Sequence, residues 1–129
     1  MIEIDPEVGK LIPISLVERE IARLPSLRVR KVLIDRYLWN SKLRAWAGYI
    51  PEVEGIVFDP TVSASAICSA KNRDWENLNL TEDEAWIFVF HHELRHASGQ
   101  ESEWECDRYA VERIIEMRRE KMDQLCKHD

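Results

Sequence analysis

The chain has 129 residues, of which 45% are hydrophobic and 33% charged, and its formal net charge is −6. This length leaves room for one domain, and an ordinary hydrophobic fraction without low-complexity tracts excludes a fully disordered chain. No apolar run approaches the roughly 20 residues that a membrane-spanning helix needs. The acidic segment Met1–Glu7 lacks the basic region of a secretory signal. We therefore expect a single cytoplasmic domain over residues 1–129, without a membrane partner.

The first third of the chain is predicted to be helical. Residues 15–24 and 26–40 carry apolar side chains at helical spacing, and Pro25 separates the two segments. Eight basic residues against three acidic ones lie between Ser15 and Ala45. Because the whole chain is acidic, nucleic acid is a poor default partner, and we interpret this basic segment as a solvated helix face. An acidic partner or nucleic acid is the alternative interpretation.

The middle of the chain is predicted to form a small sheet. Gly48 and Pro51 interrupt the helical pattern, and residues 55–60 form a short apolar strand that ends in an Asp-Pro turn. Residues 62–70 are a weaker second strand, because they are mostly small. Residues 71–80 are rich in asparagine and charge and are predicted to be a loop.

Two helices are predicted in the last third. Thr81 and Glu84 form a capping box directly ahead of the apolar run 85–90, so a buried helix begins there, and Gly99 is suited to end it. A final helix covers residues 101–125. The fold class is therefore α+β, mostly helical with a small irregular sheet, with a long helix at the end of the chain.

The first of these helices carries the chemistry. It contains His92-Glu93-Leu94-Arg95-His96, which is the H-E-x-x-H pattern. Side chains four residues apart lie on one face of a helix, so His92 and His96 can both ligate one zinc ion at about 2.0–2.1 Å. Glu93 is rotated about 100° from His92, where it flanks the metal as a general base. The same face is apolar earlier in the helix, and a metal would satisfy both imidazoles there.

A third ligand is expected from the final helix. The stripe that should face the core consists of Glu103, Asp107, Ala110, Ile114 and Met117, whereas Glu105, Arg108, Glu112, Glu116 and Arg119 form a charged stripe that should face water. Glu103 is therefore the predicted third ligand. Asp107 lies one turn further along the same face, where it can accept a hydrogen bond from the outer nitrogen of a ligating histidine. A surface ion pair is the alternative role for Asp107.

The H-E-x-x-H segment, followed by Glu103-Trp-Glu-Cys-Asp107-Arg-Tyr-Ala110, resembles zincin metallopeptidases whose third ligand lies in a downstream helix. The similarity is greatest to the ImmA/IrrE group and, more remotely, extends to other gluzincins. It implies a minimal zincin-like domain. It also implies zinc ligation by His92, His96 and Glu103, with Glu93 as catalytic acid and base and Asp107 supporting a ligand histidine.

A zinc site of this kind predicts hydrolysis of peptide bonds in a protein or peptide substrate. Zinc activates a water molecule and polarises the substrate carbonyl, while Glu93 transfers the proton to the leaving amine. By resemblance, residues 55–59 or 63–68 supply an edge strand along which the substrate lies. The transition state needs a further donor. His91, Arg95, Arg108 and Tyr109 are all close in sequence, and the choice among them stays open.

The alternative function is a metal-stabilised binding or regulatory module that cleaves nothing. Structural zinc has a closed shell of four ligands, often with cysteine, and does not need a carboxylate such as Glu93 beside it. Cys68, Cys106 and Cys126 are an odd number without C-x-x-C spacing, which favours reduced thiols. Cys106 is the nearest to the ligands in sequence, but helical phase places it off the stripe of Glu103. The sequence therefore favours an enzyme.

Overall fold

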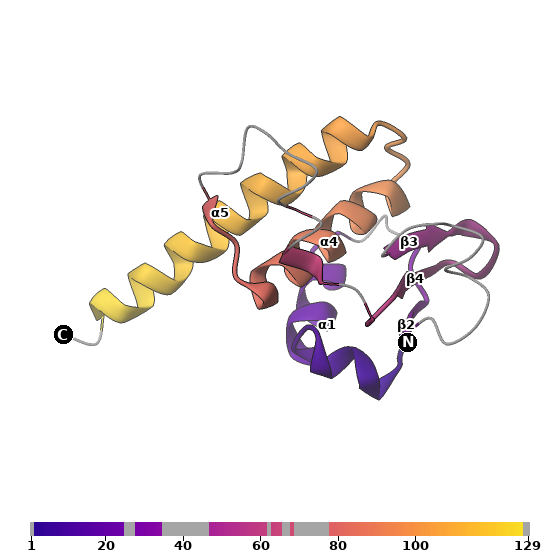
Figure 1. Cartoon of the computed structure of the whole chain (residues 1–129), viewed down its shortest axis with the longest axis horizontal. Helices are drawn as coiled ribbons and strands as arrows, with labels where there is room; N and C mark the ends of the chain where they lie inside the picture. The colour runs from indigo at the N-terminus through magenta and orange to yellow at the C-terminus, as the bar shows by residue number, and fades with distance from the viewer. Residues whose placement is uncertain are drawn as a thin grey trace.

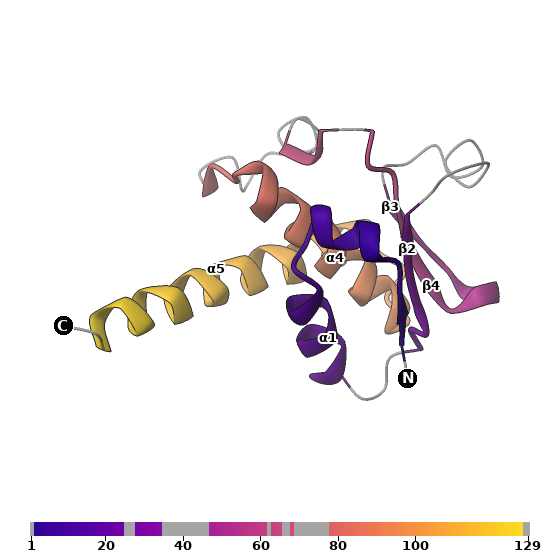
Figure 2. The same ribbon diagram turned by 90° about the horizontal axis from the view of Figure 1, so that it is seen from below.

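The fold is α+β, as the sequence predicts, with helices packed on one face of a small mixed sheet (Figures 1 and 2). The structure is a computed structural model and describes residues 2–24, 28–34, 47–61, 63–65, 68 and 78–127. Its strands are β1 (Glu3–Ile4), β2 (Lys31–Ile34), β3 (Ala47–Ile50) and β4 (Gly55–Phe58). Its helices are α1 (Ile14–Ala22), α4 (Glu82–Ala97) and α5 (Glu103–Lys127), with short 3-10 helices η1 (Pro6–Lys10) and η2 (Pro51–Val53).

Strand β2 corrects the predicted helix over 26–40. Residues Lys31–Ile34 pair in parallel with β1 on one side and with β4 on the other. Val32 and Ile34 are buried and alternate with less buried neighbours, which is the two-residue period of a strand. The helical stripe was wrong because a short apolar run fits either period, and pairing with two other strands decides between them. Residues 35–40 of the predicted helix lie outside the described residues.

Strand β3 was not predicted, whereas β4 confirms the strand expected over 55–60. The two form an antiparallel hairpin in which Ile50 pairs with Gly55 and Ala47 with Phe58. The sheet order is β1-β2-β4-β3, so β4 lies inside the sheet and β3 lies at its edge. In the sequence, Gly48 was interpreted as an interruption of the helical pattern. A glycine is nevertheless tolerated in an edge strand that pairs with a second strand.

The strand predicted over 62–70 is also wrong where the structure describes it. Ala64, Ser65 and Cys68 are helical. The carboxylate of Glu82 accepts hydrogen bonds from the backbone N–H groups of Ala64 and Ser65 at 2.8 and 2.9 Å, and from the hydroxyl of Ser63 at 3.1 Å. A carboxylate that satisfies the first free N–H groups stabilises the start of a helix. Most of the predicted loop over 71–80 lies outside the described residues.

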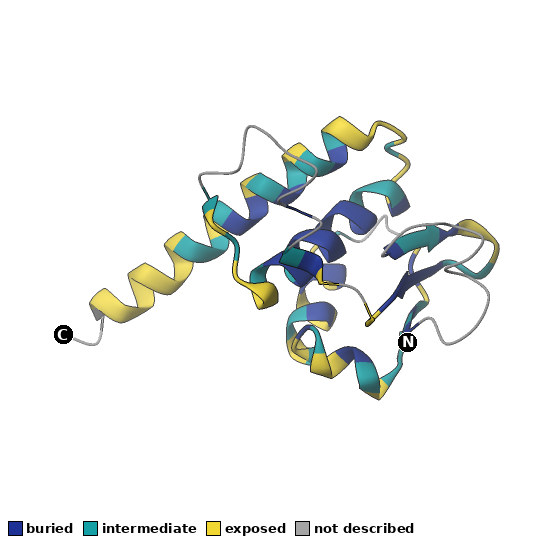
Figure 3. Ribbon diagram, in the orientation of Figure 1, coloured by how far each residue is buried: buried dark blue, intermediate teal, exposed yellow. Residues whose placement is uncertain are grey.

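Helix α4 is the centre of the core. The predicted capping box is present, because Thr81 Oγ1 accepts from the N–H of Glu84 and the Glu84 carboxylate accepts from the N–H of Thr81, both at 3.2 Å. Trp86 and Phe90 of this helix pack against Phe58 of β4, with ring centroids 5.9 and 6.4 Å apart. Figure 3 colours the ribbon by burial, and the buried residues of α4 lie between Ala85 and Ala97.

Helix α1 and helix α5 flank α4. Helix α1 confirms the helix predicted over 15–24, and α5 confirms the one over 101–125. The second half of α5 extends beyond the rest of the fold, with exposed side chains (Figures 1 and 3). None of the described helices has the length and hydropathy to cross a membrane.

The basic segment between residues 15 and 45 is not one helix face. Arg19 and Arg23 contact the carboxylate of Glu20 at 3.4 and 3.0 Å, and Arg30 pairs with Glu54 at 2.8 Å. These intramolecular pairs neutralise part of the local positive charge. Arg36, Lys42 and Arg44 of the basic segment lie outside the described residues.

Candidate metal centre

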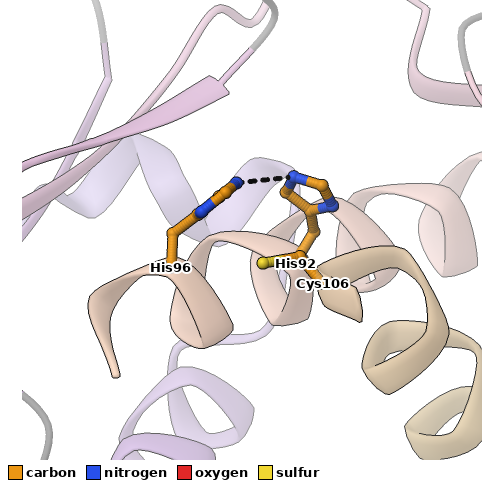
Figure 4. A group of neighbouring side chains, drawn as sticks. All are labelled: His92, His96 and Cys106. Atoms are coloured by element: carbon orange, nitrogen blue, oxygen red, sulfur yellow. Dashed lines mark hydrogen bonds between the residues drawn. The ribbon is translucent and has the colours of Figure 1, made fainter. Parts of the chain in front are cut away.

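Helix α4 places His92 and His96 one turn apart, with their Nε2 atoms pointing toward each other and their ring planes 71° apart. The two Nε2 atoms are 3.1 Å apart (Figure 4). Two ligand atoms of a tetrahedral zinc ion, each about 2.0–2.1 Å from the metal, lie about 3.3 Å from each other. His92 is buried with 5% of its surface exposed, whereas His96 is half-buried. The separation of the two nitrogens therefore fits a shared metal ion.

The first residue of α5 brings a carboxylate to the same point. Glu103 Oε2 lies 2.8 Å from Nε2 of His92, and Oε1 lies 3.0 Å from Nε2 of His96. The turn that makes this possible contains Gly99, whose φ of 103° is open to glycine and strained for other residues. A link of only seven residues from His96 thus returns the chain to the histidines.

The outer nitrogens of both histidines are already engaged. His96 Nδ1 lies 2.8 Å from the backbone carbonyl of Gln100, which only accepts, so this nitrogen carries a proton. His92 Nδ1 lies 2.6 Å from Oδ1 of Asp107, to which it donates. In the neutral histidines, both Nε2 atoms then present lone pairs to each other and to the carboxylate of Glu103. Three acceptors that face one another need a positive charge between them, from a proton or a metal ion.

The electrostatics of the site favour a cation at the same place. Burial alone would lower the pKa of His92, but the hydrogen bond to Asp107 and the negative charges of Glu93, Asp107 and Glu103 together raise it above its usual value. The positively charged form of His92 is therefore stabilised by its neighbours. A divalent ion at the same position would gain from the same three carboxylates.

Glu93 lies beside the histidines on a face that is turned toward the sheet. It is buried, with 6% of its surface exposed, and its Oε1 is 3.8 Å from Nε2 of His92. Glu93, His96 and Glu103 line one cleft of about 530 Å³. The opposite wall consists of β3 and Pro51. Three of the four groups that the sequence predicted for ligation and catalysis therefore open onto a space bounded by a strand, and the fourth, His92, is not among the lining residues.

Sequence reasoning missed the position of one further group. Cys106 is fully buried, and its sulfur lies below the two imidazoles (Figure 4). One donor atom from each of His92, His96 and Cys106 lies within 4.8 Å of the others. Burial and the nearby carboxylates, Glu103 foremost, raise the pKa of this thiol to about 12. The neutral thiol points to the carbonyl oxygen of Gln100 at 3.7 Å. Helical phase did not predict this approach because the distance between α4 and α5 is a tertiary property.

None of the four residues named as transition-state donors, Arg95 included, is among the residues that line the cleft. His91 is fully buried on the opposite side of α4, with its Nε2 3.4 Å from Oε1 of Glu20. Burial lowers its pKa to about 3, so the ring is neutral. Tyr109 is half-buried, with its ring 6.1 Å from that of His91. Arg108 is exposed and stacks over the ring of Trp104 at 5.7 Å. The structure does not bring these three residues to the cleft.

The edge strand beside the histidines also differs from the prediction. Residues 55–58 form β4, which is paired on both sides, and the described residues of 63–68 include helical ones rather than a strand. Among the described strands, the edge strand that lines the cleft is β3. Its hydrophobic signal is weak because it includes Ala47 and Gly48.

A comparison of the chain with protein-family models, with curated proteins and with solved structures found no match.

Proposed function

We propose that the chain is a zinc-dependent peptidase of the H-E-x-x-H type, with His92, His96 and Glu103 as metal ligands. The observation that carries the proposal is the convergence of two imidazole Nε2 atoms and one carboxylate within 2.8–3.1 Å, with a second carboxylate, that of Glu93, on the wall of the same cleft. Three protein ligands with an open side are typical of catalytic zinc. Zinc bound there would supply Lewis-acid activation of a water molecule and of the scissile carbonyl.

Glu93 is the proposed general base and acid. Its carboxylate is held beside His92 in a largely water-excluded position, where it accepts a proton from the attacking water and donates it to the leaving amine. Asp107 and the carbonyl of Gln100 hold the two imidazoles in the tautomer that keeps Nε2 free for the metal. None of His91, Tyr109 and Arg108 lines the cleft, so the proposal assigns them no part in the reaction.

The substrate is proposed to be an extended peptide that adds to the sheet. Strand β3 has one edge paired with β4, no strand of the described residues pairs with its other edge, and it lines the cleft opposite Glu93 and His96. Unpaired backbone groups at such an edge bind an extended chain through main-chain hydrogen bonds. Ala47 and Gly48 leave room for the peptide to approach this edge. A reducing compartment such as the cytoplasm agrees with the three free thiols.

The first test is the zinc content of protein purified without chelator. Wild type is expected to carry about one zinc per chain, and Glu103→Ala and Glu103→Gln to lose zinc affinity by more than the roughly 100-fold typical of an outer hydrogen-bond partner. Glu105→Gln removes the same charge from the same turn of α5 outside the cleft, and it should keep its zinc. Full zinc occupancy in both Glu103 variants would disprove the ligand assignment.

The second test separates catalysis from metal binding. Glu93→Gln is expected to keep its zinc and to lower cleavage of a random peptide pool by about 10²–10⁴-fold, the contribution of a general base. Equal cleavage by wild type and Glu93→Gln would remove Glu93 from the mechanism.

One observation favours a second function, a metal-stabilised module without catalysis. The sulfur of Cys106 lies close enough to His92 and His96 to close the metal shell as a fourth ligand. Cobalt substitution distinguishes the two, because a bound thiolate adds a sulfur-to-metal charge-transfer band that Cys106→Ser would abolish. For the peptidase we expect no such band, because the metal keeps an open side and the Cys106 thiol donates its hydrogen bond to the carbonyl of Gln100. A strong band together with absent cleavage would favour the module.

A further inference from the structure

The cleft in front of the histidines is lined by negative charge. Its acidic lining residues are Glu93, Glu101 and Glu103, and no lysine or arginine is among the described residues that line it. The opposite wall offers small side chains, Ala47 and Gly48, and the ring of Tyr49, whose hydroxyl donates to the carbonyl of Arg28 at 2.7 Å. Charge in this cleft therefore comes from one wall only.

Glu101 differs from its neighbours on that wall because nothing in the described chain engages its carboxylate. Glu103 contacts both histidines, and the side chain of Gln100 accepts a hydrogen bond from the N–H of Ser102 at 3.0 Å. Glu101 is exposed and makes no hydrogen bond or ion pair with any residue that the structure describes. It lines the cleft between the turn after α4 and the first residue of α5. An unengaged carboxylate at this point is free to bind a ligand.

The charge balance of the site leaves Glu101 in excess. A divalent metal ion would already be offset by the negative charges of Glu103 and ionised Glu93, and Asp107 behind His92 adds a third negative charge. The C-terminus of α4, with its partial negative charge, and the N-terminus of α5, with its partial positive charge, meet at the same turn. The two helix dipoles therefore offset each other there. Glu101 then contributes an unbalanced negative charge beside the place where a peptide would lie.

We propose that Glu101 is a specificity-determining residue that binds a lysine or arginine side chain of the peptide substrate close to the scissile bond. This inference rests on the proposed peptidase function. The cleft is open and a strand added along β3 would pass along its length, so a long cationic side chain can reach from the peptide to the exposed carboxylate. An acidic side chain at the same place would meet Glu101 as a like charge. The preferred substrates are therefore peptides with a basic residue beside the cleaved bond.

Binding of two matched ligands tests the proposal without needing turnover. Acetyl-Gly-Lys hydroxamate and acetyl-Gly-Glu hydroxamate both chelate zinc, and they differ in the charge presented next to the metal. We expect zinc-loaded wild type, and the inactive Glu93→Gln protein, to bind the lysine compound more tightly. Glu101→Gln should reduce the lysine-over-glutamate preference about twofold to fivefold, as for an exposed ion pair. Glu101→Lys should shift the preference toward the glutamate compound by about tenfold, since it replaces attraction by repulsion.

The control is Glu105→Gln, which removes one negative charge two residues beyond Glu103 without altering the cleft lining. It should leave the preference unchanged. High salt should weaken the preference of wild type, because the Debye length falls to about 3 Å at 1 M. A random peptide pool digested by wild type should show Lys and Arg enriched next to the cleaved bond, and Glu101→Lys should replace them by Asp and Glu.

The outcomes separate the two proposals. Tight binding of both hydroxamates with an unchanged preference in Glu101→Gln and Glu101→Lys would overturn the role of Glu101 and leave the peptidase standing. Failure of zinc-loaded wild type to bind either compound would overturn the catalytic centre itself, and the specificity with it. A change of preference in Glu105→Gln equal to that in Glu101→Gln would show a general charge effect and would also overturn the specific role.

Discussion

Each histidine of the pair on α4 is oriented by a different element. His92 is held by Asp107 from α5, whereas His96 is held by the carbonyl of Gln100 in the turn. His91 is next to His92 in the chain but is rotated by about 100° on the helix, and it lies against Glu20 of α1. Two neighbouring histidines therefore have different surroundings and opposite pKa shifts, lowered for His91 and raised for His92.

The hydrogen bond from His92 to Asp107 predicts the effect of one substitution. Asp107→Asn keeps the size of the side chain but removes the charge that orients the imidazole and raises its basicity, so zinc affinity should fall about 10–100-fold. Competition with a chromogenic chelator measures this change. Asp83→Asn, an exposed residue in the first turn of α4, is the matched control and should leave the affinity unchanged. An unaltered affinity in Asp107→Asn would mean that His92 is oriented by the fold alone.

A buried ion pair between Glu20 and Arg113 joins helices α1 and α5 beside His91 of α4. Arg113 Nη2 donates to Oε2 of Glu20 at 3.1 Å, and its Nε donates to the other oxygen. The two side chains are 5% and 1% exposed. Burial opposes the charge on Glu20, but the hydrogen bonds and charge of Arg113, with His91 and Arg23, lower the pKa of this carboxyl to about 2. The pair links α1 to α5, the helix that carries Glu103 and Asp107 in its first two turns.

Breaking this pair should destabilise the protein strongly, while replacing both partners should not. Arg113→Met leaves Glu20 buried with weaker compensation, and we expect a loss of about 3 kcal/mol in the free energy of unfolding. The double variant Glu20→Met/Arg113→Met should recover most of that loss, because no unpaired charge is then buried. Urea denaturation measures both. Arg108→Met, which removes an exposed pair with Glu112, should cost less than about 0.5 kcal/mol. A double variant no more stable than Arg113→Met would contradict this interpretation.

The whole molecule is organised around α4, which contacts β3, β4 and α5 along its length. Figure 2 shows this helix between the sheet and α5, with α1 beside it. The candidate metal centre lies on the side of α4 that faces β3, and the buried group of His91 and Glu20 lies on the side that faces α1. A change in the protonation of His92 on one side, or of His91 and Glu20 on the other, therefore changes the free energy of unfolding of the same core.

The metal-free protein is expected to be most stable near pH 6.5. The pKa of His91 is lowered to about 3 in the folded protein, against a pKa near 6.5 in the unfolded chain. Its contribution to the free energy of unfolding is therefore complete above pH 6.5 and is lost as the pH falls toward 3. The pKa of Glu20 is lowered to about 2, so a second loss begins below pH 4.5. The pKa of His92 is raised, so its contribution is complete below pH 6.5 and is lost at higher pH.

Urea denaturation between pH 4.5 and 8.5 in the presence of EDTA checks this dependence. Between pH 5 and 6 the free energy of unfolding should rise with pH by about 1.4 kcal/mol per pH unit, because the unfolded chain binds about one more proton than the folded protein. His91→Gln should remove most of that slope, whatever its effect on absolute stability. Saturating zinc replaces the proton on His92, so the free energy of unfolding should no longer decline above pH 6.5. An unchanged acid slope in His91→Gln would show that other groups dominate the titration.

Local patterns in the sequence predicted the parts of the molecule that depend on neighbours along the chain. The capping box of Thr81 placed the start of α4, Gly99 placed its end, and the four-residue spacing of His92 and His96 placed both rings on one face. Helical phase in α5 also selected Glu103 and Asp107 as the acids that approach the histidines. Hydrogen bonds and side-chain contacts within one helix are short-range, so one segment is enough to specify them.

Only the tertiary structure decided which segments pair and which face each element presents. The apolar run at 31–34 is compatible with a helix until β1 and β4 pair with it. Strand β3 carries too little hydrophobic signal to reveal that it is an edge strand of the described sheet. The position of Cys106 below the histidines and the burial of His91 against Glu20 follow from the distance between helices. The reason is that strand pairing and helix packing join residues far apart in the chain, and their free energy depends on both partners together.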